Sequence, residues 1–159
     1  MKSIIIYYSF SGNTQKVASL LHTYLQDKGQ SELIRLKDLK EPQGFFTQAG
    51  KALVHAKAEI AETKFNLTEY DLICLGTPVW AFGPAPAVNT YLAKCFGLEG
   101  KEVILFSTYG SGSGNTRCLN FMQQALAAKK VKGFRRFSVQ QFKADNADFV
   151  ISQIKKIGL

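Results

Sequence analysis

The chain reads SFSGNT at residues 9–14, directly after the apolar run IIIYY and directly before a stretch with helical periodicity. Hydroxyl side chains, a glycine and an asparagine therefore lie in one strand-to-helix turn. At a helix N-terminus, free backbone N–H groups and the helix dipole favour an anion. The glycine lets the backbone curl closely around such a group. The turn predicts a phosphate-binding loop, built without a cation.

A turn of this composition has two other possible functions. A Walker loop is excluded, because no G-K-[ST] follows at the required spacing. A simple helix cap stays open, because Ser11 or Asn13 alone would be enough to cap the helix.

Length and composition predict one domain with an ordinary core. The chain has 159 residues, of which 46% are hydrophobic and 20% charged. The apolar run near the N-terminus is too short for a signal-peptide core or a membrane span. We therefore expect a soluble cytoplasmic protein with no membrane association.

The cysteines give no sign of a metal site or a disulfide framework. Cys74, Cys95 and Cys118 are widely separated, with no C-x-x-C or Cys/His ligand spacing. We expect reduced thiols, with Cys74 buried in an apolar strand.

The chain is strongly basic, with a formal net charge of +8. The densest cluster is KKVKGFRR at 129–136. A basic patch attracts nucleic acid, an acidic partner or an anionic cofactor, or is a solvated edge. No nucleic-acid-binding motif accompanies it, so nucleic acid is an improbable partner.

Strand and helix patterns alternate along the chain. Continuous or alternating apolar runs predict strands at 3–9, 31–36, 71–77, 102–108 and 133–139. Helical periodicity predicts helices from Thr14 to before Gly29, over 45–62, opening at Pro84 and Pro86, from about 115, and at the C-terminus. The inner face of the C-terminal helix is predicted to carry Ala147, Val150, Ile151, Ile154 and Ile157. This alternation predicts an α/β fold with an open, doubly wound parallel sheet.

The strongest strands end in three unusual loops, at 9–14, 77–86 and 108–116. In an open parallel sheet these loops meet at one edge, where ligands bind. The second carries Trp80, the only tryptophan, which is either a core residue or a platform for a planar ring. The third is rich in glycine, which allows a ligand close to the backbone; otherwise it is a flexible surface loop.

The three loops, in this order and spacing, resemble those of the flavodoxin-like family. YYSFSGNTQKVA resembles the family's phosphate loop, LICLGTPVWAFGPAP its second flavin loop and LFSTYGSGSGNT its third. The resemblance covers essentially the whole chain. It implies a flavodoxin-like fold, with a five-stranded parallel sheet of order 2-1-3-4-5, helices on both faces and FMN as cofactor.

The resemblance also implies the residues of an FMN site. Phosphate contacts would come from the first loop and contacts to the flavin ring from the other two. By position they are Ser9, Phe10 (through its amide), Ser11, Gly12, Asn13 and Thr14; then Thr77, Pro78, Val79 and Trp80; and then Tyr109, Gly110, Gly112 and Gly114. Trp80 would be the stacking group. No residue is a convincing acid, base or nucleophile, and the flavin would do the chemistry.

Two features depart from electron-carrier flavodoxins, which are usually acidic. This chain is basic, and residues 107–116 contain no Asp or Glu. Negative surroundings disfavour an anionic reduced flavin, so we expect a less negative low-potential couple here. Partners of acidic relatives do not carry over, because their docking relies on opposite charge. The third loop is closer to that of the NAD(P)H- or quinone-reducing branch.

Two functions therefore remain. The leading one is an FMN-dependent carrier that passes electrons between protein partners. The alternative is an NAD(P)H-dependent flavin or quinone reductase, in which the partner is a small molecule such as a quinone. Phospho-acceptor domains are excluded because the strand ends offer Ser9 and Thr77 where carboxylates are needed. Low-molecular-weight phosphatases are excluded because no cysteine has an arginine six residues on.

Overall fold

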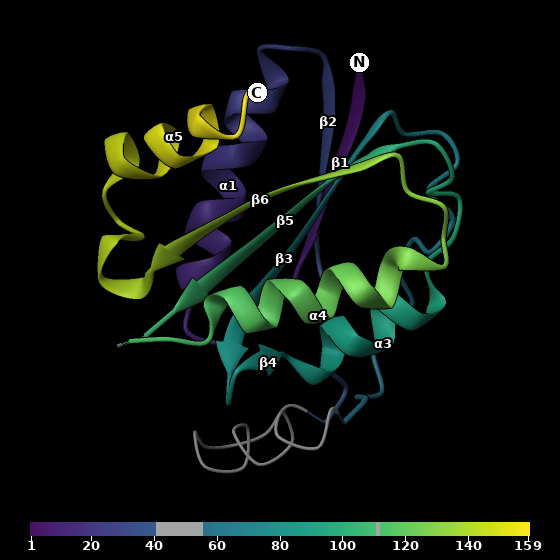
Figure 1. Cartoon of the computed structure of the whole chain (residues 1–159), viewed down its shortest axis with the longest axis horizontal. Helices are drawn as coiled ribbons and strands as arrows, with labels where there is room; N and C mark the ends of the chain where they lie inside the picture. The colour runs from purple at the N-terminus through teal and green to yellow at the C-terminus, as the bar shows by residue number, and fades with distance from the viewer. Residues whose placement is uncertain (41–55, 111) are drawn as a thin grey trace.

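The computed structural model describes residues 1–40, 56–110 and 112–159. Its centre is a parallel sheet of five strands in the order β2-β1-β3-β5-β6 (Figure 1). The strands are β1 (Lys2–Tyr7), β2 (Gln30–Arg35), β3 (Leu72–Trp80), β5 (Glu102–Tyr109) and β6 (Gly133–Gln140). Numbered among the parallel strands alone, this is the predicted order 2-1-3-4-5.

The central strands β1, β3 and β5 are apolar because both of their faces are covered. Successive residues of β1 alternate between two core clusters: Ile4 and Ile6 belong to one, Ile5 and Tyr7 to the other. Pairing with β3 aligns Ile5 with Cys74 and Tyr7 with Gly76. The register therefore presents one apolar surface to each layer of helices.

In the described part of the chain, helices cover both faces of the sheet (Figure 1). α1 (Asn13–Gln26) and α5 (Ala147–Lys156) contribute to one core cluster, and α3 (Pro86–Lys94) and α4 (Asn115–Ala127) to the other. The helices begin and end near the predicted residues, with apolar faces that include Leu21 in α1 and Met122 in α4. The prediction of helices on both faces is confirmed.

Some predictions about individual elements were wrong. A two-residue strand, β4 (Gly83–Pro84), pairs antiparallel with the end of β3, so Pro84 lies in a hairpin and the helix begins at Pro86. The predicted helix over 45–62 lies outside the described residues up to 55, and residues 56–62 are not helical. Ala147 is exposed rather than on the inner face of α5, because it occupies the first helical turn.

The three cysteines are free and buried, and the predicted burial of Cys74 is confirmed. Burial raises the pKa of the Cys95 thiol to about 11 and that of Cys118 to about 12, so both stay protonated at neutral pH. Among the described residues, no helix is both long and apolar enough to cross a membrane.

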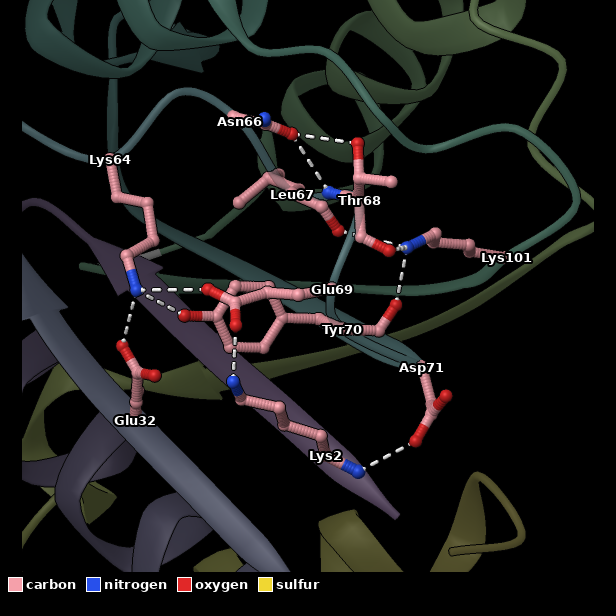
Figure 2. A network of polar contacts seen from close by, with 10 residues as sticks. All are labelled: Lys2, Glu32, Lys64, Asn66, Leu67, Thr68, Glu69, Tyr70, Asp71 and Lys101. Atoms are coloured by element: carbon pink, nitrogen blue, oxygen red, sulfur yellow. Dashed lines mark hydrogen bonds and ion pairs between the residues drawn. The ribbon is translucent and has the colours of Figure 1, made fainter.

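A polar cluster fastens the segment that leads into β3 (Figure 2). Lys101 Nζ donates to the carbonyls of Leu67 (2.9 Å) and Tyr70 (2.6 Å). Lys64 Nζ donates to Glu32 (3.0 Å) and to the Tyr70 hydroxyl. Tyr70 is buried, which raises its pKa to about 12. These bonds fix the entry into β3, at the edge of the sheet opposite the loops that follow the strands.

We predict that Gly76→Ala lowers the free energy of unfolding by about 3 kcal/mol, because overpacking a dense core is costly. Gly76 pairs with Phe106 across β3 and β5, and an added Cβ would lie 2.1 Å from the Phe106 ring. Gly110→Ala is the control, since its Cβ would meet no atom closer than 3.6 Å. Urea unfolding checks both, and equal losses would contradict the packing described here.

Candidate functional site

The three predicted loops meet at the carboxyl edge of the sheet and enclose a pocket of about 510 Å³. This volume is typical of small-molecule sites. The described residues that line it are Phe10, Ser11, Asn13, Pro78, Val79, Trp80, Ala81, Phe82, Thr108, Tyr109, Gly110, Ser113 and Gln141. Members of all three sequence-predicted groups are therefore brought together.

The first loop opens toward the pocket at the start of α1. Gly12 is the N-cap residue with a φ of 88°, a left-handed conformation that favours glycine. Open space surrounds its Cα, since an added Cβ would meet no atom within 4 Å. Ser11 and Asn13 line the pocket, and Asn13 Nδ2 donates to Ser11 Oγ at 3.2 Å. Neither is the N-cap of α1, so the simple helix-cap reading does not describe this turn.

Three of the predicted residues are buried and hold the loops in place. Ser9 Oγ accepts a hydrogen bond of 3.3 Å from the backbone N–H of Gln15. Thr14 and Thr108 share a hydroxyl–hydroxyl bond of 2.7 Å, which joins the first loop to the third. Thr77 Oγ1 accepts from the Ala85 amide at 3.0 Å. Ser9, Thr14 and Thr77 do not line the pocket; they set the shape of its walls.

The second loop is a hairpin with a strained turn. Val79 pairs with Pro84 and Trp80 with Gly83, so Ala81 and Phe82 form a two-residue turn. Both turn residues have positive φ, 44° and 69°. Hairpin turns of this kind favour Asn and Gly, and other residues adopt them at a cost of about 1–3 kcal/mol each. The strained turn places Phe82 in the pocket wall.

Trp80 lines the pocket but is mostly packed in the core. Its side chain is 7% exposed and belongs to a core cluster, with its ring edge-on to Tyr8 at 5.6 Å and to Phe10 at 6.1 Å. Phe10 and Phe82 are instead 43% and 48% exposed and also line the pocket. The exposed aromatic surface therefore comes from two phenylalanines rather than from the tryptophan.

The third loop contributes one aromatic residue, a glycine and a serine to the pocket. Tyr109, Gly110 and Ser113 line the pocket, whereas Gly112 and Gly114 do not. Gly114 is the N-cap of α4, with a φ of 119°, and an added Cβ would lie 2.7 Å from the Phe82 ring. Its role is to let Phe82 lie across the start of α4.

Five lining residues were missed by the sequence reasoning: Ala81, Phe82, Thr108, Ser113 and Gln141. Four belong to the loops that were correctly identified, and their roles depend on which way each side chain points. Gln141 comes from η1 (Gln141–Lys143), after β6, where no motif marked it.

Two arginines lie near residues that form the pocket and its first loop. None of the described residues that line the pocket is ionised at neutral pH, and no carboxylate lies among them. Arg117 lies over the Phe82 ring, 6.0 Å from its centroid. Arg35 of β2 donates from Nη2 to the Ser9 carbonyl at 2.8 Å. The first loop itself carries no cation, and β2 brings one to it from outside the motif.

Comparison with known proteins identifies the family. The family model for flavodoxin matches residues 2–145, so the chain belongs to the flavodoxin family. A flavoprotein from Lactobacillus acidophilus in complex with FMN is 25% identical over 92% of this chain and 98% of that one, with a TM-score of 0.70.

Two further structures share the fold at lower identity. The flavodoxin of Megasphaera elsdenii is 23% identical, covering 98% of this chain and 95% of that one (TM-score 0.60). An NADH:FMN oxidoreductase in its apo form is 17% identical, covering 99% and 86% (TM-score 0.67).

The residues of the pocket fit an FMN-sized ligand. The start of α1 offers N–H groups, the Ser11 hydroxyl and the Asn13 amide for a phosphate, with open space above Gly12. Phe10 and Phe82 offer exposed faces to a planar ring. These donors, together with the flavoprotein comparisons, support the predicted FMN cofactor.

We predict that Ala81→Asn raises the free energy of unfolding by about 0.5–1 kcal/mol, because asparagine tolerates the left-handed conformation better than alanine. Ala125→Asn is the matched control. Ala125 is an exposed residue within α4, where the same change lowers helix propensity and reduces the free energy of unfolding by about 0.5 kcal/mol. Thermal and urea unfolding check the opposite signs. A loss of stability in Ala81→Asn would show that the turn is not strained.

Proposed function

We propose that this member of the flavodoxin family binds FMN between the three loops and carries electrons between protein partners. One observation supports this most strongly. A turn suited to binding an anion, at the start of α1, lies next to a pocket of about 510 Å³ that is lined by exposed aromatic rings. When bound, FMN supplies the electron-transfer chemistry. The protein binds it, orients it and tunes its charge environment.

The residues would divide this work by position. Ser11, Asn13 and the backbone N–H groups from Phe10 to Thr14 would hold the phosphate. The side chains of Phe10, Val79 and Phe82 would exclude water from the ring, with Trp80 as rigid backing. Tyr109, Gly110 and Ser113 would offer polar contacts to its edge. Gly112 and Gly114 would act through the shape of the third loop rather than by contact.

The lining favours a carrier over an enzyme with its own carboxylate, imidazole, thiol or amine for proton transfer. No described lining residue is Asp, Glu, His, Cys, Lys or Arg. Phe142, which follows the pocket residue Gln141, is 69% exposed and has Lys143 Nζ 5.9 Å from its ring centroid. An apolar rim with cations beside it suits a redox partner with an acidic surface.

A reductase is the second candidate, and two arginines near the pocket favour it. Arg35 and Arg117 lie beside a pocket without a carboxylate, so an anionic NAD(P)H would approach favourably. A quinone or a free flavin would then be the acceptor. The fold shared with an NADH:FMN oxidoreductase is compatible with this function.

One spectroscopic experiment separates these functions. FMN is added to the purified protein while the fluorescence of Trp80, the only tryptophan, is followed; binding quenches it. NADH or NADPH is then added without oxygen and the visible spectrum is recorded. A carrier stays oxidised until dithionite is added, whereas a reductase bleaches within seconds. A protein that binds no FMN would refute both candidates.

We expect a low-potential couple less negative than that of acidic flavodoxins, because no carboxylate lines the pocket and Arg35 and Arg117 lie nearby. A positive environment stabilises an anionic reduced flavin. Potentiometric titration against dyes measures the couple, and Arg117→Glu should shift it to a more negative potential. A wild-type value as negative as in acidic relatives would contradict this account.

A further inference from the structure

We infer that Arg35 is a binding residue for the FMN phosphate, acting through the peptide group between Ser9 and Phe10. This inference rests on the proposed FMN site and deepens it. No residue of the SFSGNT turn carries a charge, so its affinity for an anion comes from dipoles alone. Arg35 adds the one full positive charge that the described structure bonds to this turn.

The hydrogen bond is placed to polarise the turn. Arg35 is the last residue of β2 and pairs with Tyr7, the last residue of β1, so its side chain starts beside the first loop. Nη2 donates to the Ser9 carbonyl at 2.8 Å. That carbonyl and the Phe10 N–H belong to one planar peptide group. A charged donor on the oxygen strengthens the N–H as a donor toward the pocket.

Asp38 lines the same surface hollow as Arg35 but does not pair with it. Within the part of the chain that the structure describes, the Arg35 guanidinium forms no salt bridge. Its field reaches the end of β1: burial raises the pKa of Tyr7, and the Arg35 charge opposes that rise. The Arg35 charge therefore acts on an anion at the turn, weakened by the exposure of the side chain to water.

A neighbouring lysine provides a matched control. Lys37 lines the same surface hollow of about 210 Å³ as Arg35, together with Leu36 and Asp38. It is exposed and bonds to no residue of the first loop. Lys37→Gln removes the same charge from nearly the same place but leaves the bond to Ser9 intact.

The test compares FMN with riboflavin, which lacks the phosphate. Dissociation constants are measured from Trp80 fluorescence for the wild type, Arg35→Gln, Arg35→Lys and Lys37→Gln, with unfolding curves to confirm that each variant folds. We expect Arg35→Gln to weaken FMN binding about tenfold at low salt and riboflavin binding less than about twofold. Arg35→Lys should recover most of the loss, and Lys37→Gln should change little.

Salt separates charge from loop shape. The difference between the wild type and Arg35→Gln should shrink in 1 M NaCl, where the Debye length is about 3 Å. A loss that persists in high salt, an equal loss for FMN and riboflavin, an equal loss in Lys37→Gln, or unchanged FMN binding in Arg35→Gln would each overturn the inference. Failure of the wild type to bind either flavin would instead refute the proposed function.

Discussion

The parallel pairing of β1, β3 and β5 is the constraint on which the rest of the molecule depends. Its register aligns Tyr7 with Gly76 and Gly76 with Phe106, so these three strands end at the same edge. Each strand is largely buried on both faces, so the residues that can contact a ligand lie where the strands end. The three loops therefore meet because the core requires the strands to be in step.

The loops are held by short polar links as well as by the sheet. The Thr14–Thr108 bond joins the first loop to the end of β5, and Thr77 holds the hairpin against the start of α3. The hydroxyl groups of Thr14, Thr77 and Thr108 are buried. Losing one partner of either hydrogen bond would therefore leave a buried polar group unsatisfied. Hydroxyl residues that the sequence marked as ligand contacts thus serve partly as the framework around the ligand.

Much of this arrangement could be predicted from the sequence. Buried parallel strands appear as continuous apolar runs, and glycine with hydroxyl residues after such a run is typical of an anion-binding turn, so the central strands and the three loops were found. The strand order was implied by the resemblance to the flavodoxin-like family. Side-chain direction was not predictable. Trp80 lies mostly in the core and Phe82 faces the pocket because a two-residue turn reverses the chain between them. Arg35 was missed because it is distant in sequence and becomes a neighbour of Ser9 only through strand pairing.

The central claim is that the three loops form one FMN site. The most direct test is a titration of ¹⁵N-labelled protein with FMN, followed by backbone amide chemical shifts. The account predicts the largest shifts at residues 10–14, with further shifts at 79–82 and 109–113 and little change around Lys64 and Lys101 at the opposite edge. Shifts centred away from the three loops, or none at saturating FMN, would contradict it.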